Sequence, residues 1–141
     1  MKRLFLAIVT LLLCTLASAQ VSNQTVNPLP LASYTSNTVN SPDQTNYNFR
    51  GGHFIVNISS YISGNYTPHI QAKDPVSGVY YDVLIGTALS ANGTTVLKVY
   101  PGIGVSANGS ASDTLSLTWR VQLVGASTPS MTVSVDAFLL P

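Results

Sequence analysis

The side chains that could perform acid–base chemistry are few in this sequence. Glutamate is absent, and the chain carries five aspartates and two histidines. Hydrolytic catalysis needs paired carboxylates, or a nucleophile with a base and an orienting group. The sequence contains no Gly-x-Ser-x-Gly elbow, His-Glu-x-x-His helix or phosphate-cradling glycine loop. The aspartates are scattered over turns, loops and outward strand faces: Asp43, Asp74, Asp82, Asp113 and Asp136. We therefore expect no enzymatic activity and no catalytic residue.

The candidate metal ligands are equally sparse. Two histidines with a carboxylate could bind zinc, but nothing in the spacing of His53 and His69 favours such a site, and we expect both to be solvated surface side chains. Asp43 beside Gln44 and Asn46 could offer oxygen ligands to calcium. However, no loop repeats acidic residues at alternate positions. We expect no metal and no cofactor.

Aromatic side chains leave one ligand class open. Aromatic platforms beside Asn and Gln suit carbohydrate, and the chain has seven tyrosines. Tyr66 and Tyr81 fall on apolar faces, so we assign them to the core. Four others remain as candidate exposed aromatics: Tyr47, Tyr61, Tyr80 and Tyr100. A carbohydrate-binding module is therefore the alternative function.

The first residues, MKRLFLAIVTLLLCTLASAQ, are typical of a secretory leader. Lys2 and Arg3 precede an apolar stretch, and a small-residue triplet that ends at Ala19 forms a cleavage signal. The apolar stretch is shorter than the roughly 20 residues of a membrane-spanning helix. We expect cleavage to remove residues 1–19 and to leave a secreted or cell-surface chain with no stable membrane insertion.

The composition of the remaining chain limits its partners. The only cysteine, Cys14, leaves with the leader, so the core must hold without disulfides. Removal of Lys2 and Arg3 changes the formal net charge from +1 to −1. The remaining Lys and Arg are scattered, whereas nucleic-acid binding needs them clustered. We expect no nucleic-acid partner.

Period-two alternation of apolar residues dominates the rest of the sequence. It is clearest over 114–124 and 130–139, which we predict to be half-buried strands. Trp119 lies in the middle of the first stripe and should anchor the core. Shorter segments predict further strands at 31–39, 53–62, 66–73, 79–85 and 94–100.

Two turn regions connect these strands. Residues 66–85 predict a hairpin closed by DPVSG, and Pro68 lacks an amide donor, so its strand should be at an edge or bulged there. SPDQTNYNFRGGH, residues 41–53, predicts a structural corner rather than a site. In this corner Asp43 and Asn46 should bond nearby amides.

About seven strands with no helical periodicity predict an all-β fold, a single antiparallel β-sandwich with immunoglobulin-like or jelly-roll wiring. We place the sandwich domain at residues 41–141 and an N-terminal arm, with a candidate first strand, at residues 20–40. The start of the arm has two prolines and few apolar residues, so it should not pack firmly within its own domain. Residues 20–40 are either a flexible segment followed by an ordinary first strand, or an arm that adds a strand to the sheet of a neighbouring subunit.

The order of segments after Ser41 is similar to that of a known group of proteins. DQTNYN comes first, QAKDPVSGVYY, TTVLKVYPG and TWRV follow, and KDPVSG and VLKVYPG are the most specific pieces. These segments resemble small all-β proteins encoded by tailed bacteriophages, which are assigned to the virion without a defined role. The resemblance implies a structural or interaction role and transfers no catalytic residue.

The secretory leader distinguishes this chain from that group. Virion proteins are assembled in the cytoplasm and do not normally carry such a leader. Either a cell has adopted the domain for its surface, or a similar sandwich serves a secreted assembly. We expect a non-enzymatic structural or adhesive subunit of a surface or virion-like assembly. Its partners would be copies of itself or another surface protein, because few charges must be desolvated in such contacts.

Overall fold

The computed structural model describes residues 22–141, so the expected leader and its cleavage site lie outside the described residues. The described residues form strands and no helix, which confirms the all-β prediction. In chain order the strands are β1 (Gln24–Tyr34), β2 (Thr38–Asn40), β3 (Gln44–Thr45), β4 (Gly51–Lys73), β5 (Tyr80–Ile85), β6 (Gly93–Val99), β7 (Ser110–Ala111) and β8 (Thr118–Leu140). This part of the chain has no helix that could span a membrane.

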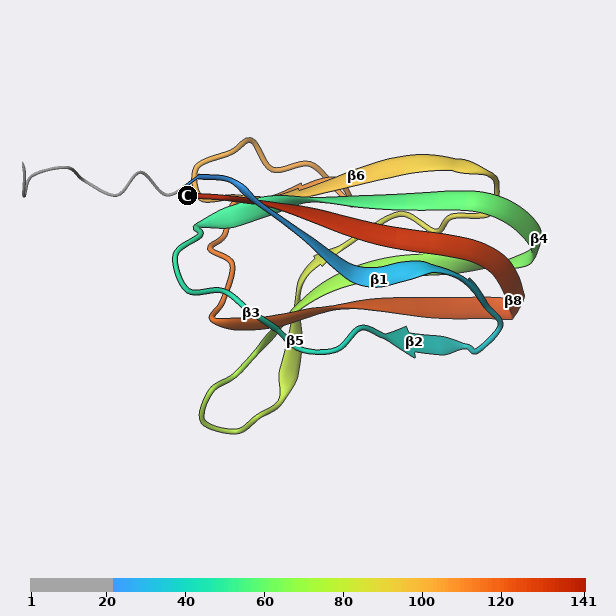
Figure 1. The fold of residues 1–141 in the computed structure, drawn as a ribbon, viewed down its shortest axis with the longest axis horizontal. Helices are drawn as coiled ribbons and strands as arrows, with labels where there is room; N and C mark the ends of the chain where they lie inside the picture. The colour runs from blue at the N-terminus through green and yellow to red at the C-terminus, as the bar shows by residue number, and fades with distance from the viewer. Residues whose placement is uncertain (1–21) are drawn as a thin grey trace, which may run out of the picture.

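Two long strands organise the fold. β4 and β8 are 23 residues each and pair antiparallel from end to end. Their register shifts between Ile58 and Asn65, where both strands bend and the ribbon folds over (Figure 1). Strands predicted separately at 53–62 and 66–73 are therefore the two halves of β4. The segments 114–124 and 130–139 likewise belong largely to the two halves of β8.

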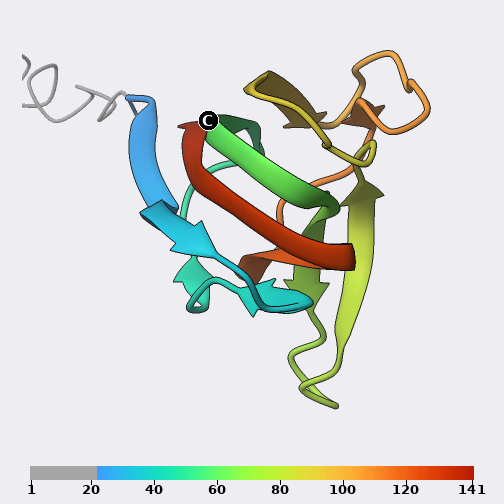
Figure 2. The same ribbon diagram turned by 90° about the vertical axis from the view of Figure 1, so that its right-hand side faces the viewer.

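The folded ribbon makes two layers (Figure 2). The first layer combines β1, the second half of β8, the first half of β4, β6 and β7, and the second combines β2, β3, the first half of β8, the second half of β4 and β5. Because β4 and β8 continue from one layer to the other, the sandwich is a single eight-stranded sheet. β7 pairs parallel with β6, so the sheet is mixed rather than purely antiparallel.

The core lies between the two layers and contains the inward side chains of the predicted stripes. Trp119 is fully buried, and its ring meets that of Phe54 edge to face, with centroids 5.3 Å apart. Val121, Leu123 and Val135 are also fully buried. The prediction that Trp119 anchors the core is confirmed.

The N-terminal arm packs within its own domain, contrary to the prediction. β1 starts at Gln24 and pairs with the second half of β8, and Leu29 is buried in the core. Register shifts flank Leu29, and these irregularities accommodate Pro28 and Pro30 in a strand. The sandwich therefore begins at Gln24 rather than Ser41. The strand predicted at 31–39 is divided by a bend between β1 and β2.

The predicted hairpin of residues 66–85 is present as the second half of β4 and β5. Pro68, however, lies neither at an edge nor at a bulge. Its strand pairs with β8 on one side, and on the other the Pro68 carbonyl accepts the Gly86 amide at 2.7 Å. The missing proline N–H faces the same side, opposite Gly86 and just beyond the end of β5, so no hydrogen bond of the β4–β5 ladder is lost. The bulge occurs instead between Ile70 and Gln71.

Candidate functional site

The outer face of the second layer carries the main polar cluster, which we call the polar face. Strand alternation turns Ile70, Ala72 and Trp119 into the core and their neighbours outward. The polar face consists of His69, Gln71 and Lys73 of β4, Tyr80 and Asp82 of β5, and Arg120 and Gln122 of β8. It brings together His69, Tyr80 and Asp82, which the sequence offered as candidate functional residues.

Tyr80 is the centre of one half of the polar face. The Arg120 guanidinium lies 3.5 Å from its ring centroid, and the Lys73 ammonium lies 5.2 Å away. Asp43, from the corner loop, accepts hydrogen bonds from the Tyr80 hydroxyl and from Lys73 Nζ, the latter at 3.0 Å. These two bonds, first that from Tyr80, hold the pKa of Asp43 below its ordinary value. The bond to Asp43 raises the pKa of Lys73 in turn, so both groups stay charged at neutral pH.

Gln71 is the centre of the other half. Its side-chain amide donates to Asp82 Oδ1 at 2.9 Å and accepts the Arg120 Nε–H at 2.8 Å. His69 Nδ1 lies 3.0 Å from the same Asp82 oxygen. Gln122 donates to Asn40 of β2 at 2.7 Å. Arg120 contacts both Tyr80 and Gln71, so hydrogen bonds and cation–π contacts connect the two halves of the polar face.

The two histidines lie on different layers of the sandwich. His53 lies on the first half of β4, opposite Phe138 and Lys98 on the outer face of the first layer, whereas His69 belongs to the second layer. Within residues 22–141, no three His, Cys, Asp or Glu side chains form a group that could hold a metal ion. The two imidazoles therefore do not share a site.

The corner loop 41–53 is organised by Asn46 rather than by Asp43. The buried Asn46 side chain donates to the carbonyls of Phe49 and Leu115, both at 2.7 Å, and accepts the Phe49 amide at 2.9 Å. This confirms the predicted local bond for Asn46, whose Oδ1 accepts the amide hydrogen of Phe49. Asp43 differs from the prediction, because its carboxylate bonds Lys73 and Tyr80 instead of nearby amides.

Of the two tyrosines assigned to the core, only one is buried. Tyr66 is buried, as predicted, and its hydroxyl donates to the Ser36 carbonyl at 2.8 Å. Tyr81 is half exposed, so its assignment to the core is wrong. Its side chain shares the inward face of Ala72, but the first layer does not extend over this end of the second layer. Leu117 is exposed for the same reason.

Exposed apolar side chains gather at this end of the molecule, where the hairpin turn projects from the sandwich (Figures 1 and 2). Val76 is 94% exposed, Val79 63%, Leu117 58% and Tyr81 50%. Tyr81, Leu117 and Pro75 also line a groove of about 210 Å³. We call these five residues the hairpin surface. Sequence alternation identified the face on which Tyr81 and Leu117 lie, but it could not indicate where the opposite layer ends.

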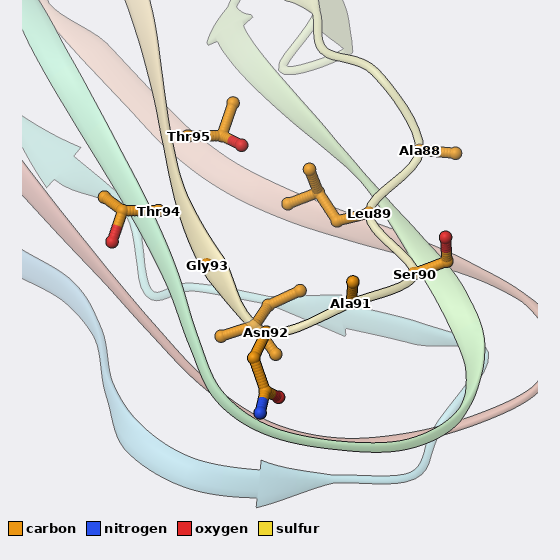
Figure 3. A pocket seen from close by; sticks show the side chains of 9 residues that line it. Ala88, Leu89, Ser90, Ala91, Asn92, Gly93, Thr94 and Thr95 are labelled. Atoms are coloured by element: carbon orange, nitrogen blue, oxygen red, sulfur yellow. The ribbon is translucent and has the colours of Figure 1, made fainter.

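A second hollow, of about 380 Å³, lies between β6 and the loop that precedes it. Ile58 and residues 88–95 line it. Leu89 points from the loop toward β6, whereas Asn92 points away from the hollow (Figure 3). The hollow holds no charged side chain and lies beside one edge of the first layer.

Comparisons with protein-family models, with curated proteins and with solved structures found no match to this chain.

Proposed function

We propose that the chain is a secreted, non-enzymatic β-sandwich that serves as a structural or adhesive subunit of a surface or virion-like assembly. The observation that carries the proposal is the hairpin surface. Val76, Val79, Tyr81 and Leu117 expose apolar side chains together on a projecting element. Gathered, exposed apolar side chains of this kind mark interaction sites more often than scattered ones do.

The electrostatics of the described residues support the same proposal. Lys73 is paired with Asp43, and the Asp82 carboxylate is hydrogen-bonded by Gln71 and lies 3.0 Å from His69 Nδ1, so these carboxylates and the ammonium already have partners within one chain. None of the five residues of the hairpin surface is charged. Lys73 lines the same groove, but its ammonium is already paired with Asp43. A contact through this surface therefore desolvates little charge. Desolvation of charged groups is the main cost of burying polar surface, so that cost is small here. The resemblance to virion proteins of tailed bacteriophages agrees with a subunit of this type.

Light scattering of the secreted protein tests the proposal. We expect the average mass to rise with protein concentration, and we expect Val76→Asp with Leu117→Asp to weaken that rise, because each would place a carboxylate in the contact. Val105→Asp is the matched control, since Val105 is 73% exposed on a different loop. A protein that stays monomeric at every concentration would refute the proposed function. Equal effects of Val105→Asp and the hairpin variant would remove the hairpin surface from it.

A carbohydrate-binding module is the second candidate, and the polar face favours it. Hydrogen bonds connect amide, carboxylate and imidazole groups from Gln122 through Gln71 and Asp82 to His69, and such groups bond sugar hydroxyls. Against it, the ring of Tyr80 is covered by Arg120, so it offers no free stacking platform on that side. Binding to a glycan array that is lost in Gln71→Ala would favour the module over the assembly subunit.

A further inference from the structure

Most strand edges of the sandwich carry features that discourage pairing with another chain. β1 contains Pro28 and Pro30 and two register shifts. β5 has a register shift next to the charged Asp82. β2 has three residues, and β3 and β7 have two each. Proline, bulges, charge and shortness are the usual means by which open edges avoid pairing.

β6 lacks these features over most of its length. It has seven residues and no proline, and it pairs with β4 without a register shift. Its other edge meets β7 only at Lys98 and Val99. Lys98 is its only charged side chain and lies at this covered end. Among the strands of residues 22–141, β6 therefore has the longest regular stretch of open edge.

The backbone N–H and C=O groups at alternate residues of the open stretch point away from β4. The Lys98 N–H donates to the Gly109 carbonyl at 3.0 Å, on the side away from β4. Backbone groups alternate in direction along a strand, so the N–H and C=O of Thr94 and Val96 point to the same side as those of Lys98. β7 begins at Ser110, opposite Lys98, and so does not extend to Thr94 and Val96. These groups therefore face no strand within the described chain.

We propose that this edge of β6 pairs antiparallel with the same edge of a second copy of the chain, about a two-fold axis at Thr95. The proposal rests on the proposed assembly function and names one of its contacts. In this register Thr94 exchanges backbone hydrogen bonds with Val96 of the second copy, and Val96 does so with the second copy's Thr94. Contacts of this isologous kind close after two subunits.

Charge and space both fit a second copy. In this register the uncharged residues 93–97 pair with residues 97–93 of the second copy, so no two like charges meet across the contact. Lys98 remains paired with Ser110 of β7. The two Thr95 residues occupy a non-hydrogen-bonded pair, in which Cα atoms approach to about 4.5 Å. Thr95 lines the hollow of about 380 Å³, which provides room for both side chains at the axis.

Cysteine cross-linking tests the position of the axis. The expected mature chain has no cysteine, so Thr95→Cys introduces a single thiol. With oxidised glutathione as the oxidant, we expect a disulfide-linked dimer from Thr95→Cys. Thr25→Cys, at an exposed threonine on the proline-containing edge strand β1, should give little dimer under the same conditions.

A proline variant tests the backbone contact. Val96→Pro removes an N–H that faces away from β4, so it should preserve the fold and block the pairing. We expect it to raise the dissociation constant at least about tenfold, whereas Val96→Thr, which keeps the N–H and the branched shape, should change it by less than about threefold. Circular dichroism checks folding, and Val96→Lys serves as the blocking variant if the proline variant does not fold.

The outcomes separate the two proposals. If the wild-type chain assembles but Thr95→Cys forms no more dimer than Thr25→Cys, and Val96→Pro or Val96→Lys assembles normally, the β6 contact is wrong and the proposed function stands. A wild-type chain that remains monomeric at every concentration overturns both.

Discussion

Trp119 is the only tryptophan in the chain, and its indole fills the space between the two layers. The ring packs edge to face on Phe54, which contributes beyond simple burial. The indole N–H, by contrast, is buried without a hydrogen-bond partner. The stabilisation that Trp119 provides therefore comes from apolar packing and not from a polar bond.

Substitution of Trp119 checks this account. Trp119→Ala should lower the free energy of unfolding by about 3–5 kcal/mol, as expected for a large aromatic removed from a core. Trp119→Phe should cost much less, because no hydrogen bond is lost with the indole N–H. Urea unfolding followed by circular dichroism measures both. Native Trp119 fluorescence that is red-shifted and readily quenched by iodide would contradict the burial of the indole.

Asp43 links the corner loop to the polar face and makes stability depend on pH. Its carboxylate has a lowered pKa in the folded chain because of the bonds from Tyr80 and Lys73. Such a group stabilises the fold above its unfolded pKa, and this contribution is lost as pH falls through the folded pKa. We expect Asp43→Asn to lose a modest part of the stability at neutral pH and to show a smaller further loss on acidification than the wild type.

Urea unfolding near neutral pH and at about pH 3 measures this difference. Asp113→Asn is the control, because Asp113 lies in another loop and its carboxylate bonds only the adjacent Thr114 amide. An equal dependence on pH in the wild type and Asp43→Asn would show that the bonds at Asp43 contribute nothing to the fold.

Among the strands, the bend of β4 is the feature that converts one ribbon into two layers. Gly64 lies in this bend with a φ of +69°, and a Cβ there would come within 2.6 Å of Pro129 Cα. Gly78, in the hairpin turn, has nearly the same φ, +72°, but a Cβ added to it would meet no atom within 4 Å. The two glycines thus share a backbone requirement and differ in their surroundings.

Alanine substitution at the two glycines isolates the effect of crowding. Both variants must adopt the left-handed conformation, which costs roughly 1–2 kcal/mol. Gly64→Ala must also displace the β8 backbone, so it should lose clearly more stability than Gly78→Ala in thermal unfolding. Equal losses would indicate that the bend relaxes without strain, and the close approach of β4 to β8 would then not be required.

For the chain as a whole, the sequence predicts export and cleavage after Ala19. Intact-mass spectrometry of the secreted protein should give a mass that starts at Gln20, lowered further where Gln20 has cyclised. The cationic start and the small-residue cleavage signal provide the reason. Recovery of the full-length chain from a membrane fraction would contradict this prediction.

The sequence by itself determined the fold class, the hairpin and the identity of most core residues. These depend on period-two alternation and on turn residues, which are local properties of the chain. The stripe around Trp119 and the Asp-Pro-containing turn at 74–78 are examples. Because alternate side chains of a strand point to opposite faces, the inward positions could be identified before their partners were known.

Only the tertiary structure decided which segments pair and where each layer ends. β1 becomes part of the core through Leu29, although its prolines predicted a loose arm, because β8 supplies a long partner strand. Tyr81 and Leu117 carry the inward pattern but are exposed, because the first layer stops short of them. Asp43 meets Tyr80 although 37 residues separate them. Pairing across such separations depends on how two bent strands fold over each other, and no local pattern encodes that geometry.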